Sequence, residues 1–135
     1  MSEPIIQLPR YAASLGITLD HWDQGRPVLA LDFSDSVRGF PGLFHGGALG
    51  GLLEMAAIAA LQAELTGSGD QLRLKPINIT VEYMRGATAR RAFARGEVVR
   101  QGRRLANVRA IIWQENPDRP CAIGFTNVLL ADPGT

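Results

Sequence analysis

One long apolar segment constrains the fold of this chain more than any other feature. Gly46 to Ala63 contains a single charged residue, Glu54, and the spacing of its leucines and alanines predicts a helix from Ala48 to Leu65. The sequence Thr66-Gly67-Ser68-Gly69 is expected to end this helix. A helix that is apolar around most of its circumference must be covered on several sides. The rest of the chain therefore has to supply a layer that can surround it.

The same segment must be tested as a membrane span. Its length is marginal for crossing a bilayer, and a carboxylate near the bilayer centre costs a few kcal/mol. Met1 to Arg10 has no basic stretch followed by an apolar run, so we expect no signal peptide. The single cysteine, Cys121, excludes an intrachain disulfide, and no Cys/His set has the spacing of zinc ligands. We predict a cytoplasmic protein with no membrane partner and no bound metal.

The regions on both sides of the helix are predicted to form strands. Ile17 to Asp23 and Val28 to Phe33 read as a hairpin before the helix. Four β-branched, regularly spaced strands after it favour an antiparallel meander. These are Leu72 to Met84, Arg90 to Arg100, Leu105 to Gln114 and Cys121 to Leu130. The predicted class is α+β, in the order β-β-α-β-β-β-β, with a curved antiparallel sheet wrapped around one helix in a single domain, 1–135. Such a sheet has edge strands, which a second copy often protects by pairing.

Positive charge is concentrated in the second half of the chain. Of the 14 Lys and Arg residues, ten lie between Arg73 and Arg109, where only Glu82 and Glu97 oppose them. This distribution suits an anionic ligand, although a solvated strand face would also produce it. The arginines have no interleaved aromatic residues and no recognisable motif of a nucleic-acid-binding protein. We therefore expect no nucleic-acid partner.

The start of the helix combines two features that suit chemistry. Gly46 and Gly47 lie where the loop becomes the helix, so their N–H groups have no acceptor within the helix and lie at its positive end. A ligand can approach such glycines closely, which suits a developing oxyanion, although tight packing explains them too. Glu54 lies roughly 10 Å beyond Gly47 on nearly the same face. A carboxylate on this apolar surface needs a partner, a protonation shift or a solvated cleft. For His45 alone, shaping the loop is the simpler interpretation.

His45-Gly46-Gly47, with an acidic residue nine positions after the histidine, resembles the signature of hotdog-fold thioesterases. The closest resemblance is to the phenylacetic-acid-degradation type, which includes 4-hydroxybenzoyl-CoA thioesterases of one lineage. Asn78 to Ala87 resembles the family's strand after the helix, and Val98 to Ala106 its late hairpin. The resemblance covers roughly Phe33 to Leu130.

This resemblance implies hydrolysis of an aryl- or medium-chain acyl-CoA to the free acid and CoA, without a cofactor. It implies that Glu54 acts as nucleophile or as general base for water, and that the Gly46 N–H polarises the thioester carbonyl, with His45 and Gly47 beside it. It also implies a homodimer or homotetramer with active sites at the dimer interface. Candidate substrate-binding residues are Arg85, Arg90, Arg103 and Arg104 for the coenzyme A phosphates, and Phe44, with Leu43, Leu53, Met55, Ile58, Phe93 and Trp113 as further pocket candidates.

Two departures from the family pattern keep alternatives open. Many relatives have an asparagine where this chain has Gly39, and a Ser or Thr near Pro76. Thr80, Asn78 or Gln62 could supply the missing polar contact. The first alternative is a hotdog 3-hydroxyacyl thioester dehydratase, whose histidine would lie further upstream, near Phe40. The second is a non-catalytic acyl-CoA-binding hotdog module, which the missing helper residues favour.

Overall fold

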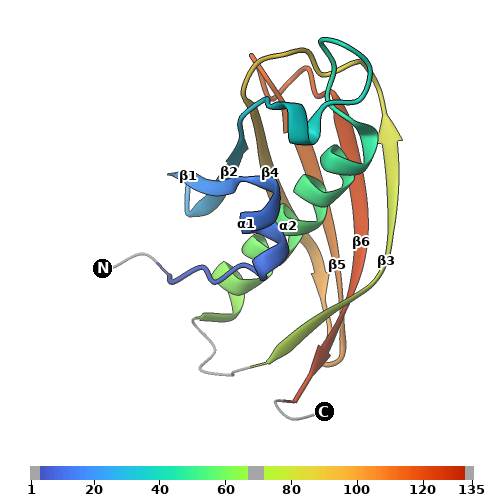
Figure 1. Ribbon diagram of the computed structural model, residues 1–135. Helices are drawn as coiled ribbons and strands as arrows, with labels where there is room; N and C mark the ends of the chain where they lie inside the picture. Colours follow the sequence, from blue (N-terminus) through green and yellow to red (C-terminus); the bar gives the residue numbers. More distant parts are fainter. Residues whose placement is uncertain (1–3, 67–71, 133–135) are drawn as a thin grey trace.

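The computed structural model describes residues 4–66 and 72–132, which form one antiparallel sheet wrapped around a long helix (Figure 1). The helix α2 spans Gly46–Leu65, preceded by the short helix α1 (Arg10–Leu15) and the 3-10 turn η1 (Asp35–Val37). The strands are β1 (Ile17–Asp23), β2 (Arg26–Leu31), β3 (Arg73–Tyr83), β4 (Ala92–Gln101), β5 (Leu105–Trp113) and β6 (Ala122–Ala131). The predicted α+β class and the order of long helix and strands are confirmed. The predicted helix stop at Gly67, Ser68 and Gly69 lies outside the described residues.

The helix α2 forms the centre of the core. The sheet packs against it with alternating residues, as in β6, where Ala122, Thr126 and Val128 are buried against the helix side. A window of α2 is apolar and long enough to cross a membrane, but 72% of that window is buried inside the protein. Helices that are apolar on most sides belong in a covered core. The apolar pattern of this segment is therefore explained by the sheet.

The topology differs from the predicted meander in the position of β3. The strands are ordered β1-β2-β4-β5-β6-β3, so only β4, β5 and β6 form a meander, and β3 lies at the sheet edge beside β6. The reason is that β2 pairs with β4 on one side while β5 pairs with it on the other, which leaves no place for β3 there. The eight residues 84–91 between β3 and β4 are long enough to cross the end of the sheet, whereas a two-residue hairpin would not be. β3 is consequently one of two edge strands.

The N-terminal segment, residues 4–15, packs on the helix side of the molecule. It includes α1, which ends at Gly16 in the left-handed conformation, with φ of 88°. Leu8 and Leu15 pack against the buried core around α2. Figure 1 shows this segment, in dark blue, lying across the middle of α2. The sequence indicated no element here, because six residues are too few for a periodic pattern to stand out.

Candidate active site

The first turn of α2 leaves one backbone donor available. His45 caps the helix, and its Nδ1 accepts a hydrogen bond of 2.8 Å from the Gly47 N–H. The N–H groups of Ala48 and Leu49 donate to the His45 carbonyl. No acceptor among the described residues takes the Gly46 N–H, which is the first of the helix. Of the two predicted glycine donors, Gly46 is therefore the free one, and His45 occupies the other.

Tyr83, at the end of β3, fixes the peptide that follows this donor. Its hydroxyl donates to the Gly46 carbonyl oxygen at 2.8 Å. A Cβ at position 46 would lie 3.3 Å from both Cζ and the hydroxyl oxygen of Tyr83, closer than a side chain normally sits. The glycine at position 46 is thus explained by the tyrosine that lies against it. Sequence reasoning missed this role, although Tyr83 ends the alternating run of its strand.

Glu54 lies on α2 in an apolar pocket of about 500 Å³. The carboxylate is half-buried, and within the described residues no donor or cation contacts it. The pocket is lined by α2 (Glu54, Met55, Ile58, Gln62), by the start of β3 and the residue before it (Leu72, Leu74, Pro76), and by the N-terminal segment (Gln7, Leu8, Pro9, Tyr11). A carboxylate without a partner on such a surface costs stability, so this position suits a reactive group. In the described chain, no group of three or more His, Cys, Asp or Glu residues is placed to hold a metal ion.

The two departures from the family pattern have structural causes. A Cβ at Gly39 would lie 3.1 Å from Cα of His45, so the loop leaves little room for a side chain there. Pro76 lies in the edge strand β3 at a bulge, where a missing N–H is tolerated. Of the proposed replacements, Thr80 and Asn78 pair with Phe125 and Asn127 on the outer face of the sheet, away from α2. Gln62 is the one that lines the Glu54 pocket.

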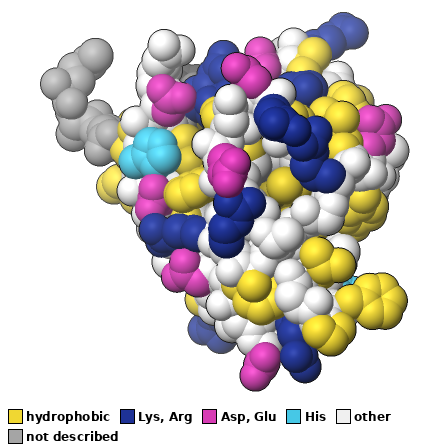
Figure 2. Space-filling view, turned by 90° about the horizontal axis from the view of Figure 1, so that it is seen from above, with side chains coloured by type: hydrophobic (Ala, Val, Ile, Leu, Met, Phe, Trp, Pro, Cys, Tyr) yellow, Lys and Arg dark blue, Asp and Glu magenta, His cyan; other side chains and the backbone are white. Residues whose placement is uncertain are grey.

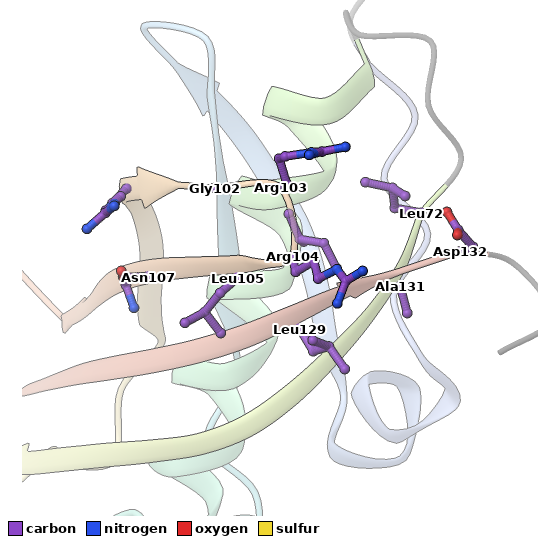
Figure 3. A pocket seen from close by; sticks show the side chains of 11 residues that line it. Leu72, Gly102, Arg103, Arg104, Leu105, Asn107, Leu129, Ala131 and Asp132 are labelled. Carbon is purple, nitrogen blue, oxygen red and sulfur yellow. The ribbon is translucent and has the colours of Figure 1, made fainter.

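The four candidate arginines fall into two clusters at opposite ends of β6. Arg85 and Arg90 line a pocket of about 180 Å³ with Arg119, and Arg90 pairs with Glu115. Arg103 and Arg104 line a larger pocket of about 960 Å³ with Arg100 (Figure 3). The Arg85 N–H bonds to the carbonyl of residue 121, and the Arg104 carbonyl to the N–H of residue 130. The two contacts are nine positions apart in the chain, a distance of roughly 30 Å along the strand. Since Tyr83 contacts Gly46, the first cluster lies at the Gly46 end of the sheet.

Several predicted pocket residues lie elsewhere. Phe44 is buried in the core, where its ring packs edge-on against Phe33 at 5.1 Å between centroids. Leu53 is fully buried, and Phe93 stacks on Trp113 in a separate cluster on the outer side of the sheet. Met55 and Ile58 do line the Glu54 pocket, while Tyr11, Gln7 and Leu8 were not predicted. They come from the N-terminal segment, whose residues carry no sequence signal of proximity to Glu54.

Exposed apolar side chains gather at the end of the molecule that carries the start of α2. Phe40, Tyr83 and Met84 are 80, 56 and 54% exposed. The view from above shows apolar side chains grouped on one side of this end, beside charged ones (Figure 2). A group of exposed apolar residues next to a candidate donor indicates a contact surface for a ligand or for another chain.

Comparison with known proteins agrees with this fold. The family model for the acyl-CoA thioesterase N-terminal domain matches residues 39–128. No curated protein sequence gives a match. A thioesterase from Haemophilus influenzae has a similar structure, with a TM-score of 0.78 at 15% identity over 92% of this chain and 84% of that one.

Two further solved structures are similar along their whole length. A variant of a thioesterase from Staphylococcus aureus gives a TM-score of 0.75 at 18% identity, over 91% of this chain and 99% of that one. A variant of the phenylacetic acid degradation protein from Thermus thermophilus gives 0.71 at 24% identity, over 90% and 98%. At these identities the structures show the shared fold, and the predicted hotdog arrangement is confirmed.

Proposed function

Because the chain belongs to the acyl-CoA thioesterase family, whose model covers residues 39–128, we propose that it hydrolyses an aryl- or medium-chain acyl-CoA with Glu54 and Gly46 as its reactive groups. Thioester hydrolysis as the general activity follows from the family. The assignment of residues is carried by one observation, the half-buried carboxylate of Glu54, which has no partner in the described chain and lines an apolar pocket.

The chemistry needs an attacking group and a donor for the carbonyl oxygen. As a general base, the Glu54 carboxylate takes a proton from water, and the hydroxide attacks the thioester carbon. As a nucleophile, Glu54 attacks first and forms an anhydride that water then hydrolyses. In both routes the Gly46 N–H stabilises the oxyanion, a donor contribution of about 3–4 kcal/mol. The carbon–sulfur bond breaks as the oxyanion collapses, and CoA leaves as the thiolate.

The site takes one group from each of two copies in this proposal. Gly46 and Glu54 are eight residues apart on one helix, a rise of about 12 Å. A reacting carbonyl must lie within about 3 Å of both attacking group and donor. One thioester therefore does not reach both groups of the same chain. The long edge strand β3, whose Ile77 is 56% exposed, is the place where a second copy would pair and bring its own Gly46 to Glu54.

Coenzyme A phosphates are assigned to Arg85 and Arg90 in this proposal. A thioester held at Gly46 lies at the Tyr83 end of the sheet, where this cluster is, and Arg119 adds a third positive charge. The cluster of Arg103 and Arg104 lies at the other end of β6. Replacing Arg85 and Arg90 together by glutamine should raise KM and flatten its salt dependence. The same change at Arg103 and Arg104 is the matched control.

Thiol release from a panel of acyl-CoAs tests the proposal. The panel runs from phenylacetyl- and 4-hydroxybenzoyl-CoA to straight-chain substrates. Glu54→Ala should lose about a hundredfold or more, the scale of a main acid–base group. Stabilisation of the fold by acyl-CoA without release of thiol would instead favour a non-catalytic binding module. This alternative is considered because the loop leaves little room for a polar side chain at Gly39.

Mixing two inactive variants tests the shared site. Glu54→Ala removes the attacking carboxylate and Gly46→Pro removes the N–H donor. A mixed dimer therefore contains one site in which both groups are intact. After refolding together they should recover about a quarter of the wild-type rate, because random pairing gives one intact site in half of the dimers. A mixture as inactive as its components refutes the sharing of one site between two copies.

A further inference from the structure

The Glu54 pocket has its roof in the N-terminal segment. Glu54, Ile58 and Gln62 are spaced four residues apart, so they lie in a row on one face of α2 and form its floor. Leu72, Leu74 and Pro76 form one wall, and residues 7–9 and 11 lie across the top. The floor from Glu54 to Gln62 is about 12 Å long. The pocket is thus an elongated apolar space with the carboxylate at one end.

Two glutamines line the other end of the pocket. The Gln62 side-chain amide donates to the Gln7 carbonyl oxygen at 2.6 Å and accepts from the Gln7 N–H at 2.9 Å. This Gln7–Gln62 pair uses the main chain of one residue and the side-chain amide of the other. The two hydrogen bonds hold the Gln62 side-chain amide in one orientation against the Gln7 main chain. It ties the N-terminal segment to the Gln62 end of α2.

Tyr11 holds the segment at the Glu54 end. Its hydroxyl lies 2.6 Å from the place that a Cβ on Gly51 would occupy, so the ring lies directly on the helix one turn before Glu54. The remaining lining near the floor is aliphatic, with Leu8, Met55 and Ile58. A group inside the pocket would meet aliphatic carbon along its length, which suits an alkyl chain.

Resting on the proposed thioesterase function, we infer that the N-terminal segment limits the length of the acyl chain, with Gln62 as the positioning residue that sets the limit. The acyl chain extends from Glu54 along Ile58 and stops at the Gln7–Gln62 pair. The coenzyme A part of the bound substrate extends away on the opposite side of Glu54. The enzyme therefore prefers chains that end before Gln62, and the pair excludes longer ones.

Chain-length profiles of Gln62→Ala and Leu8→Ala test this inference. Values of kcat/KM are measured for hexanoyl-, octanoyl-, decanoyl- and dodecanoyl-CoA. Each additional methylene that becomes buried raises kcat/KM about fourfold. Gln62→Ala should therefore raise the ratio of dodecanoyl- to hexanoyl-CoA hydrolysis by at least about tenfold. Leu8→Ala widens the same end without breaking the pair, and should shift the ratio in the same direction.

Two controls separate the inference from a general loss of structure. Glu64→Ala changes an exposed residue on the same helix outside this pocket, so the ratio should stay as in the wild type. Exchange of the Gln7 N–H with solvent should quicken in Gln62→Ala and not in Glu64→Ala. If Gln62→Ala does not fold, Leu8→Ala carries the test.

The outcomes distinguish this inference from the proposed function. A wild type that releases no thiol from any acyl-CoA overturns both. A wild type with Glu54-dependent turnover, whose length profile is unchanged by Gln62→Ala and Leu8→Ala, overturns only the length limit. Hydrolysis of aryl-CoAs alone, with no turnover of the straight-chain series, also overturns only the length limit.

Discussion

Replacing Gly46 by proline removes one hydrogen-bond donor while keeping the helix. Gly46 is the first residue of α2, a position where proline is common because its fixed φ suits the helix and its missing N–H has no helical acceptor. His45, which would precede the proline, already has φ −67° and ψ 136°, the extended conformation that a following proline demands. The chain should therefore fold with Gly46→Pro.

The expected loss follows from the hydrogen bonds of the first turn. The Gly47 N–H is held by Nδ1 of His45, and the next two N–H groups donate to the His45 carbonyl. No other donor in this turn can replace the Gly46 N–H without breaking a bond. Removing a single oxyanion donor lowers kcat by about 10²–10³-fold, equivalent to roughly 3–4 kcal/mol. We expect Gly46→Pro to fall in this range.

Gly46→Ala is the matched control, because it adds a similar Cβ but keeps the N–H. This Cβ would lie 3.3 Å from the Tyr83 ring, so the ring must move by a few tenths of an ångström. The cost is at most the Tyr83 hydrogen bond, about 1 kcal/mol, or roughly fivefold in rate. The assay is kcat for thiol release by both variants, with far-UV circular dichroism as the check on folding. Equal kcat for Gly46→Pro and Gly46→Ala would refute Gly46 as the oxyanion donor.

Three further outcomes follow from the same contacts. Tyr83→Phe should lower kcat about two- to tenfold with little change in KM, because the hydroxyl that fixes the Gly46 carbonyl contributes about 0.5–1.5 kcal/mol. An unchanged kcat would show that this hydrogen bond has no catalytic role. Glu54→Gln should raise the free energy of unfolding by about 1 kcal/mol in denaturant titrations, since it removes a half-buried charge without a partner in the described chain. The exposed Glu64→Gln should change this free energy by less than about 0.5 kcal/mol. Destabilisation by Glu54→Gln would point to a structural ion pair. Burial raises the pKa of the Cys121 thiol, so thiolate is scarce at neutral pH. Labelling by a thiol reagent should therefore be slow in the native protein, faster at high pH and fast after unfolding. Rapid labelling of the native protein at pH 7 would contradict the buried position.

The elements of the fold were predictable because their patterns are local. The apolar run of α2 and the alternation in β5 and β6 repeat over nine or more residues, long enough for period to identify them. The place of β3 was not, since pairing with β6 instead of β4 depends on which neighbours the other strands have taken. The short helix α1 was missed because six residues are too few to show a helical period.

The groups proposed as reactive could be picked out from the sequence, whereas their surroundings could not. Glu54 stood out as a lone charge in an apolar helix, and Gly46 as a glycine at a helix start, both of which are visible in sequence. The contact of Tyr83 with Gly46 joins residues 37 positions apart, and that of Gln7 with Gln62 spans 55 positions. Contacts of this range come from the curvature of the sheet around α2. A single sequence taken alone contains no signal for them.

The proposed sharing of the site between two copies links catalysis to the protection of the sheet edge. β3 is the edge strand that carries Tyr83 beside the Gly46 donor, and its start, with Leu74 and Pro76, walls the Glu54 pocket. An exposed edge of eleven residues is a liability that proteins cover. A second copy paired along β3 would cover this edge, and the same pairing would bring Gly46 of one chain toward Glu54 of the other. On this mechanism, a chain that does not pair has both groups and no place where one thioester meets them.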